Sequence, residues 1–315
     1  MRWRDLGGPV GRLAPGSRNS ITDVPGVRVG HAQAASGQRT GVSVVEPPSL
    51  PTPAGAAVIN GVGELTAKLE IDERGEIQTP VYLCGTHAVG TVYQAAVLAS
   101  GRGPDDAVIP VVGECDDGDM ADSRSVGAGD VDAALSNLGL DVGEGSVGAG
   151  TGMVCFDFPG GIGTASRVVG DHHVGVLLLC NFGDRDYLDV PGLEFGPVAD
   201  RRESHGSCIA VCATDAPLSA QQLRRLALRP LLGLARIGSY GAEGSGEIGV
   251  AFGTATGGDL PTERIDPYFA AAYEAAHEAV YNCLVAARPA LRLDGSMQES
   301  FPVGRLSAPR APGRA

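Results

Sequence analysis

The chain has 315 residues, 43% hydrophobic and 19% charged, which suits one large domain or two medium ones and excludes wholesale disorder. Its 24 basic and 37 acidic residues give a net charge of −13, so a polyanionic partner such as nucleic acid or an anionic membrane would be repelled. Glycine, with 47 residues, is about twice as frequent as its usual share and predicts many tight turns.

The chain carries no sequence feature of export or membrane insertion. No apolar run approaches the ~20 residues of a membrane span, and the first residues, MRWRDLGGPVGRLAPG, lack the apolar core of a secretory signal. The seven cysteines are odd in number, scattered and without a C-x-x-C pair, which is typical of buried free thiols in a reducing compartment. We therefore expect a cytoplasmic protein.

Short apolar runs alternate with helical patterns along the chain and predict a layered α/β protein. Runs this apolar are typical of strands that are buried on both faces. The predicted strands are 55–60, 107–113, 174–181, 207–214 and 247–254. Between them, apolar positions at helical spacing predict helices over 86–100 and 131–139, the second with Asp130 as its N-cap.

Two later helices have clearer signals. Ser219 to Gln222 forms a capping-box pattern that opens one helix, in which Pro230 predicts a kink or break. Asp266 and Pro267 open the other, FAAAYEAAHEAVYNCLVAA. The polar, aperiodic stretch 185–206 predicts a long exposed connection, and residues 306–315 are predicted to be disordered.

The junction HGSCIAVCATDAPL, where this connection meets a strand, has the chemistry for self-cleavage. Gly206 has no side chain, so the hydroxyl of Ser207 can approach the Gly206 carbonyl carbon unobstructed. Attack would move the acyl group from nitrogen to oxygen, and hydrolysis of that ester would leave Ser207 with a free α-amine. On these two residues alone, a small turn that begins a strand is the better interpretation.

Other blocks along the chain change that interpretation. In order they read RDLGG, NSITDVPGVRVGHA, NGVGELTA, GTHAVG, VVGECDDG, VGAGTGMVCFDFPGGIGTASRVVGD, LLLCNFG, GSCIAVCATDAPL and GSGEIGVAF. Together they resemble the P1 or S58 family of serine peptidases, which includes the L-aminopeptidase/D-Ala-esterase/amidase and the β-peptidyl aminopeptidases. The resemblance implies an Ntn-hydrolase-like αββα sandwich in four layers and usually a homotetramer. It also implies autocleavage between Gly206 and Ser207 into chains 1–206 and 207–315 that stay together.

The resemblance also implies roles for individual residues. Ser207 would be the nucleophile, with Ser245 and Glu247 of the GSGE block as its hydrogen-bonding partners. Their i, i+2 spacing places both side chains on one face of a strand, although the block alone could be a turn. Asn181, at the end of LLLCN, would supply an oxyanion-hole donor alongside a backbone N–H. Without the resemblance, a turn-forming Asn is an equal alternative.

By the same resemblance, Glu114 in VVGECDDG would bind the ammonium group of the substrate; taken alone, it is one more solvated acid. This chain departs from close relatives at two points. It has Cys84-Gly85-Thr86-His87 where they read T-N-T-H, and Cys115 and Asp116 where they carry an aromatic after the glutamate. Both changes fall near the inferred substrate site, where lost bulk and added negative charge favour small or cationic N-terminal residues.

Signals for other ligands are weak. Gly143, Gly145 and Gly148 fit G-x-G-x-x-G by spacing but lack the strand and helix of a nucleotide site. The acidic residues between 116 and 122 do not have EF-hand spacing, and the adjacent His172 and His173 would point to opposite faces of a strand. We predict no metal and no cofactor.

Three functions are consistent with these features of the sequence. The leading hypothesis is a self-activated serine aminopeptidase or amidase acting on small amine-bearing peptides, amides or esters. A self-cleaving hydrolase of a non-peptide amide would keep the same nucleophile; the related ornithine acetyltransferases typically use threonine, so Ser207 argues against them. The non-enzymatic alternative is an uncleaved small-amine-binding protein on the same scaffold, which the intact Gly206-Ser207 pair with Ser245 and Glu247 disfavours.

Overall fold

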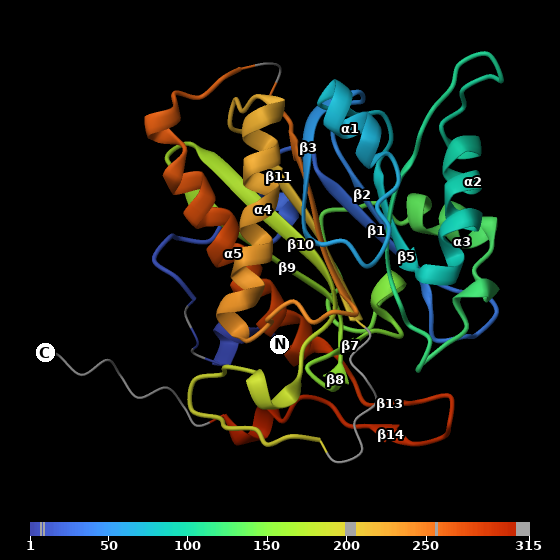
Figure 1. Ribbon diagram of the computed structural model, residues 1–315, viewed down its shortest axis with the longest axis vertical. Coiled ribbons are helices and arrows are strands. Elements are labelled where there is room, and N and C mark those ends of the chain that lie inside the picture. Colours follow the sequence, from blue (N-terminus) through green and yellow to red (C-terminus); the bar gives the residue numbers. More distant parts are fainter. Residues whose placement is uncertain (7, 9, 199–205, 256–257, 307–315) are drawn as a thin grey trace, which may run out of the picture.

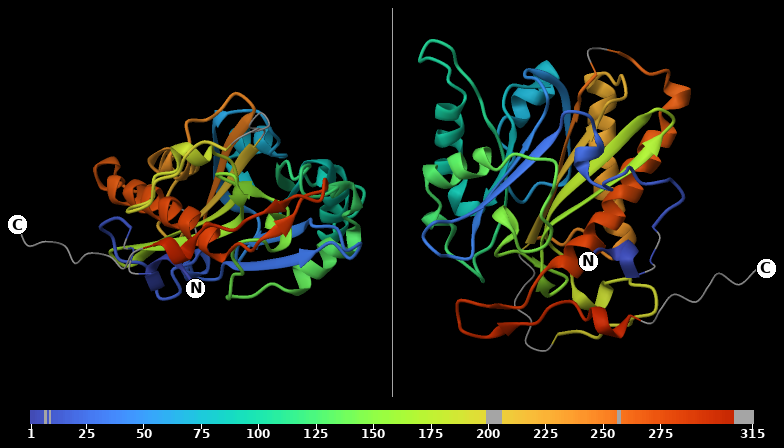
Figure 2. Two further views of the ribbon diagram at one scale, coloured as in Figure 1. Left: turned by 90° about the horizontal axis from the view of Figure 1, so that it is seen from below. Right: turned by 180° about the vertical axis from the view of Figure 1, so that it is seen from behind.

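The computed structural model describes residues 1–306 except 7, 9, 199–205 and 256–257. Two β-sheets lie face to face, and each is covered on its outer side by a pair of α-helices (Figure 1). Seen from below, the two helical layers lie on opposite sides of the stacked sheets (Figure 2). The predicted four-layer αββα sandwich is therefore confirmed.

The smaller sheet has four strands in the order β1-β2-β5-β6. They are β1 (Arg28–Gln33), β2 (Gly41–Glu46), β5 (Val81–Gly85) and β6 (Val111–Cys115). β5 and β6 are parallel, whereas the other pairs are antiparallel. Helices α2 (Val89–Ala99) and α3 (Ala128–Ser136) cover its outer face with small and β-branched side chains, which allow close approach to the sheet.

The larger sheet has six strands in the order β4-β3-β12-β11-β10-β9. They are β4 (Glu76–Ile77), β3 (Thr52–Asn60), β12 (Ser245–Gly253), β11 (Gly206–Thr214), β10 (His172–Asn181) and β9 (Gly161–Val169). Only β11 and β12 are parallel. β11 therefore lies in the middle of the sheet, with a hydrogen-bonded neighbour on each side.

Helices α4 (Ala220–Ile237) and α5 (Asp266–Ala286) cover the outer face of this larger sheet, and the short α1 (Lys68–Arg74) lies beside β3 and β4. Two short hairpins complete the fold. They are β7 (Val154–Cys155) with β8 (Phe158–Pro159), and β13 (Ala290–Leu291) with β14 (Met297–Gln298). No helix in the described part of the chain has both the length and the apolar character that crossing a membrane requires.

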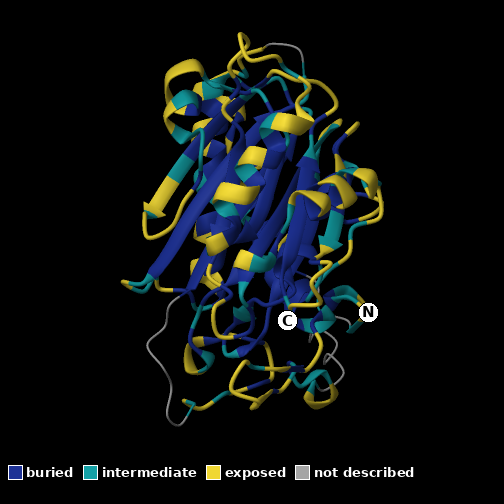
Figure 3. Cartoon of the chain, turned by 90° about the vertical axis from the view of Figure 1, so that its right-hand side faces the viewer, coloured by how far each residue is buried: buried dark blue, intermediate teal, exposed yellow. Residues whose placement is uncertain are grey.

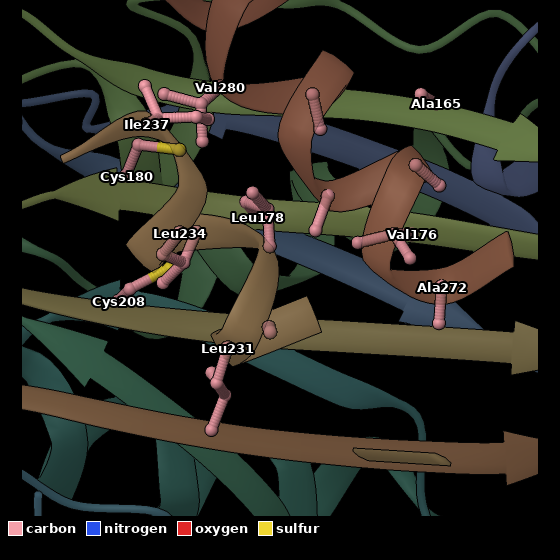
Figure 4. Packing of buried hydrophobic residues seen from close by; sticks show 14 of the residues in the cluster. Ala165, Val176, Leu178, Cys180, Cys208, Leu231, Leu234, Ile237, Ala272 and Val280 are labelled. Atoms are coloured by element: carbon pink, nitrogen blue, oxygen red, sulfur yellow. The ribbon is translucent and has the colours of Figure 1, made fainter. Parts of the chain in front are cut away.

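The strands alternate their side chains between two apolar cores. Leu179 and Ile209 contribute to the core between the sheets, whereas Cys180 and Cys208 face the outer core under α4 and α5 (Figure 4). Both faces of the central strands β11 and β12 are buried as a result, and Figure 3 shows dark blue strands in the middle of the sheets. This explains why the sequence runs are apolar without alternation.

Most predicted elements are confirmed, with three differences. The run 107–113 becomes a strand only from Val111, and α3 begins at Ala128, because Gly127 is its N-cap; the Asp130 carboxylate accepts a hydrogen bond from the Gly127 N–H at 2.9 Å. Helix α4 continues through Pro230 without a break. The predicted connection 185–206 is only partly exposed, because Leu188, Val190 and Leu193 are buried in the core under α4 and α5. Its residues 199–205 lie outside the described part, as do residues 307–315 of the predicted disordered end.

Candidate active site

Ser207 lies near the start of β11, between two neighbouring strands. It is directly opposite Asn181 of β10 and Gly246 of β12. Its hydroxyl faces the space between the two sheets, where it accepts a hydrogen bond from the Gly246 N–H at 3.3 Å and donates to the Val62 carbonyl at 3.4 Å. The residue is 6% exposed. The hydroxyl is thus fixed by main-chain groups rather than by a charged side chain.

Gly206 has a packing reason to be glycine, in addition to the chemical one. A Cβ at this position would lie 2.2 Å from the Asn181 carbonyl oxygen, a distance that no real side chain tolerates. Its N–H donates to the Gly244 carbonyl at 3.4 Å, so the residue already belongs to the sheet. The peptide group that precedes Ser207 is therefore held close against β10.

The Asn181 side chain has only one orientation that satisfies its neighbours. Its Oδ1 accepts from the Val154 N–H at 2.8 Å, and its Nδ2 donates to the Asp116 carbonyl at 2.8 Å. If the amide were flipped, its NH₂ group would face the Val154 N–H and its oxygen would face the Asp116 carbonyl, and neither pair can form a hydrogen bond. Because an amide nitrogen carries two protons, one N–H of Nδ2 has no partner in the described part of the chain.

Ser245 and Glu247 share one face of β12, as their spacing predicted, but it is not the face of the Ser207 hydroxyl. In the parallel register, Gly246 is the partner of Ser207, and a Cβ on Gly246 would lie 3.3 Å from Ser207 Oγ. Ser245 and Glu247 instead pair with Gly206 and Cys208. The expected direct hydrogen bonds to the Ser207 hydroxyl are therefore not formed; the two side chains flank the main chain of Ser207.

The Glu247 carboxyl group is buried, and no described cationic side chain pairs with it. Its Oε1 accepts from the Ser245 hydroxyl at 2.6 Å, and its Oε2 has no partner in the described part of the chain. Removal from water raises the pKa of Glu247, and the Ser245 hydrogen bond opposes that shift only in part. A buried carboxyl with a raised pKa and a free oxygen is suited to accepting and returning a proton.

Glu114, near the end of β6, reaches the same region from the other sheet. Its Oε1 accepts from the Glu64 N–H at 2.8 Å, and its Oε2 accepts from the Thr86 hydroxyl. A Cβ at Gly63 would lie 3.0 Å from Glu114 Oε1 and 3.7 Å from Ser207 Oγ, so carboxylate and hydroxyl border the same space. Burial raises the pKa of Glu114, which the Thr86 and Glu64 hydrogen bonds counteract in part.

The assembled groups can perform acyl transfer. The Ser207 hydroxyl, an oriented amide N–H, a buried carboxyl–hydroxyl pair and a second buried carboxylate come from the ends of neighbouring strands in the two sheets. Among the described residues, no group of three or more His, Cys, Asp or Glu side chains is arranged to hold a metal ion.

Comparison with known proteins agrees with this geometry. The family model described as peptidase family S58 matches residues 19–298. The chain belongs to this family. A β-peptidyl aminopeptidase, BapA of Sphingosinicella microcystinivorans, is 37% identical over an alignment that covers 98% of this chain and 91% of that protein.

Two solved structures extend the agreement to the fold. A β-aminopeptidase of a Burkholderia species has a TM-score of 0.87 and 39% identity, covering 97% of both chains. The L-aminopeptidase D-Ala-esterase/amidase of Ochrobactrum anthropi, described as a variant of the Ntn-hydrolase fold, has a TM-score of 0.85 and 33% identity, covering 97% of this chain and 96% of that one. The chain is thus similar to Ntn-hydrolase-fold serine aminopeptidases over nearly its whole length.

The two positions expected to depart from close relatives lie side by side. Gly85 and Cys115 are partners in the parallel pair β5–β6. A Cβ at Gly85 would lie 2.5 Å from Ser123 Cβ and 2.6 Å from Asp117 Oδ1, so a larger residue there would have to displace both side chains. The Cys115 side chain is fully buried in the core between the sheets, so it does not line the substrate site, contrary to expectation. Asp116 is exposed, and its charge contributes to the raised pKa of Glu114, after the larger effect of burial.

Several contacts were not assigned from the sequence. Val62, Gly63 and Glu64 form the NGVGELTA turn that touches both Ser207 and Glu114, and Thr86 follows β5 in GTHAVG. Both blocks contributed to the S58 resemblance. Their main-chain and hydroxyl roles carry no side-chain signature, so only the three-dimensional arrangement reveals them.

Proposed function

We propose that this S58 member is a self-activating serine aminopeptidase or amidase with Ser207 as its nucleophile. The observation that carries the proposal is that Ser207 Oγ and Glu114 Oε1 border the same space, and that the strand partner of Ser207 is Asn181, whose Nδ2 has one N–H without a partner among the described residues. Each group matches one requirement of the reaction: attack, stabilisation of the oxyanion, and recognition of a free amine.

Self-cleavage would begin with attack of Ser207 Oγ on the Gly206 carbonyl carbon. The carbon–nitrogen bond breaks, the former amide nitrogen takes a proton, and an ester joins Gly206 to Ser207 Oγ. Water then hydrolyses the ester and leaves a Gly206 carboxylate and a Ser207 α-amine. The two chains, 1–206 and 207–315, would stay together because β11 remains hydrogen-bonded between β10 of the first chain and β12 of the second.

Substrate turnover would repeat this chemistry on an external amide or ester. Ser207 Oγ attacks the carbonyl, Asn181 Nδ2 donates to the oxyanion, and water releases the acyl group. The proton is handled by the new α-amine or by Ser245 and Glu247. The position of Ser245 and Glu247 beside the main chain of Ser207 supports a role through that amine rather than directly on the hydroxyl.

Glu114 supports a substrate with a free amine at its N-terminal end, because a partly desolvated carboxylate pairs strongly with an ammonium group. The family relatives include β-peptidyl aminopeptidases and an L-aminopeptidase, so α- and β-amino substrates are both included in the proposal. The homotetramer and the cytoplasmic location stay predictions from the sequence.

A denaturing gel of the purified protein tests the proposal directly. We expect two fragments, residues 1–206 and 207–315, and the smaller one should begin Ser-Cys-Ile-Ala-Val. Ser207→Ala should stay one chain and be inactive. A single band after prolonged incubation, or a different new N-terminus, would refute self-cleavage and favour a binding protein. A cleaved protein that is inert toward aminoacyl p-nitroanilides would favour the non-peptide amide hydrolase.

A further inference from the structure

The carboxylate of Glu114 is held by two donors from different parts of the fold. Thr86 comes directly after β5, the parallel neighbour of β6, and its hydroxyl donates to Oε2. The Glu64 N–H donates to Oε1 at 2.8 Å. With both oxygens engaged and 3% of the residue exposed, the carboxylate has a single orientation.

Of the two groups that donate to Glu114, only one can be removed by a side-chain substitution. The Glu64 N–H belongs to the main chain, so only the Thr86 hydroxyl can be deleted without changing the backbone. A threonine hydroxyl has one proton, and here it is given to a carboxylate, a contact that favours the ionised form. Without it, one buried oxygen of Glu114 would lose its hydrogen bond while remaining desolvated.

We infer that Thr86 is a positioning residue that keeps Glu114 charged and aimed toward Ser207, and thereby sets the demand for a free amine. The inference rests on the proposed function, because it assigns Thr86 to the proposed ammonium-binding carboxylate. Thr86 has no contact with the Ser207 hydroxyl, whose partners are Val62 and Gly246. Its effect should therefore fall on KM rather than on kcat.

Most of the surroundings of Glu114 disfavour its charged form, and the Thr86 hydrogen bond opposes them. Burial raises the pKa of Glu114, and the negative charges of Asp116 and Glu64 raise it further. The thiols of Cys84 and Cys115 lie close by, but burial raises the pKa of each well above its usual range, so neither becomes charged near neutrality. Among the facing groups, only the Thr86 and Glu64 hydrogen bonds favour the carboxylate anion.

Substrate affinity should depend on the ionisation of Glu114. An ammonium substrate binds only to ionised Glu114, so affinity is lost as pH falls through the pKa of this residue. Deleting the Thr86 hydroxyl raises that pKa further, and the loss should begin at a higher pH. Measurements between pH 5 and 7 keep the substrate amine, with a pKa of about 8, protonated. Any change in that window then belongs to the protein.

The experiment compares Thr86→Val, Thr86→Ser and wild type on Ala p-nitroanilide, after a gel shows each to have matured equally. For Thr86→Val we expect KM to rise about tenfold or more at pH 7 with little change in kcat. The acid limb of kcat/KM should move to higher pH, and Thr86→Ser should restore both. Thr214→Val is the matched control. It removes a buried hydroxyl at the far end of β11, which donates to the His173 carbonyl at 2.8 Å, and should leave KM unchanged.

Two outcomes separate this inference from the proposed function. If wild type cleaves N-acetyl-Ala p-nitroanilide as fast as the free amine, the ammonium role of Glu114 fails and the inference fails with it. If wild type refuses the blocked substrate but Thr86→Val keeps the wild-type KM and pH profile, only the inference is overturned. Should Thr86→Val not fold or mature, Thr86→Ala, which also lacks the hydroxyl, carries the same expectation and the same refuting result.

Discussion

Buried carboxylates occur in two regions of this molecule, and their surroundings are opposite. On α5, Glu278 is fully buried and meets two guanidinium groups: Arg167 at 2.8 Å and Arg4 at 2.7 Å. Arg167 also lies 3.3 Å from Glu274. Although burial pushes the pKa of Glu278 upward, these partners hold it below its usual range. The charged form of Glu278 is therefore favoured, and the region joins the N-terminal segment, β9 and α5.

At the strand ends around Ser207, the carboxyl groups have no cation among the described residues. In the described part of the chain, Glu247 has only the Ser245 hydroxyl as a partner, and Glu114 has one hydroxyl and one main-chain N–H. Burial raises the pKa of both. Groups in this state bind a proton or a cation readily, which is what a catalytic or binding role requires.

The comparison teaches that burial alone does not identify a functional acid. A paired carboxylate contributes to stability and is inert, whereas an unpaired one costs stability and is available for chemistry. Substitutions in the two regions should therefore separate activity from stability, and the following predictions test that separation.

The largest expected effect is on turnover in Glu247→Gln. An amide cannot exchange a proton with the Ser207 amine, so we expect kcat on Ala p-nitroanilide to fall by orders of magnitude. Stability should stay the same or rise slightly, because a neutral amide is easier to bury than a carboxyl that must be desolvated. Near-normal activity would remove Glu247 from the mechanism. Maturation must be checked on a gel first, because an uncleaved variant would also be inactive.

Arg167→Met should instead lower the stability of the protein. It leaves Glu274 and Glu278 buried with too little positive charge, which typically costs about 3–5 kcal/mol of stability. Denaturant unfolding should be measured in the Ser207→Ala background, where a single chain is expected. Arg236→Met is the matched control, since its pair with Asp189 is more than half exposed and worth at most about 1 kcal/mol. Equal effects of the two substitutions would contradict the structural role of the buried pair.

The sequence was sufficient for the elements that carry the site. The apolar runs of β10 and β11 predicted both strands, and with them the strand-end positions of Asn181 and Ser207. The layers followed from the family resemblance and from strands too apolar to have a solvated face. These features depend on local composition, which a sequence displays directly.

Register and long-range contacts could not be predicted in this way. The i, i+2 spacing of Ser245 and Glu247 fixed their common face, but only the pairing of β12 with β11 determines that Ser207 faces the other way. The Cys115 side chain was expected near the substrate and is in the core instead. Thr86 meets Glu114 only because β5 and β6 are neighbours. Such relations between strands are a property of the whole sheet.

Asn181→Ala tests the uncharged side chain among the groups around Ser207. Losing one oxyanion donor should reduce kcat about 10²–10³-fold with a smaller change in KM. Asn181→Asp is a useful companion, because it can still accept from the Val154 N–H but cannot donate to the Asp116 carbonyl. If Asn181→Asp turns over as fast as wild type in a single-turnover assay, the donor role is wrong.

The smallest expected effect concerns Asp116, the exposed charge next to the unpaired Glu114. Its carboxylate adds negative potential at the proposed amine site, so Lys p-nitroanilide should be preferred over Leu p-nitroanilide by wild type. In Asp116→Asn this preference should fall by about fivefold or less, the size expected for one exposed charge. High salt should reduce it in wild type too, because exposed charges are screened.

Asp119→Asn provides the control for Asp116, since it removes the same charge from the same loop. Its carboxylate lies 3.3 Å from the Arg292 guanidinium, so its field at the amine site is already partly neutralised. The Lys-to-Leu ratio should therefore stay near the wild-type value. If both substitutions lower the ratio equally, the preference reflects the net charge of the protein and not the position of Asp116. If neither lowers it, the Asp116 charge does not select the substrate, and size alone should be tested with β-Ala and Glu p-nitroanilides.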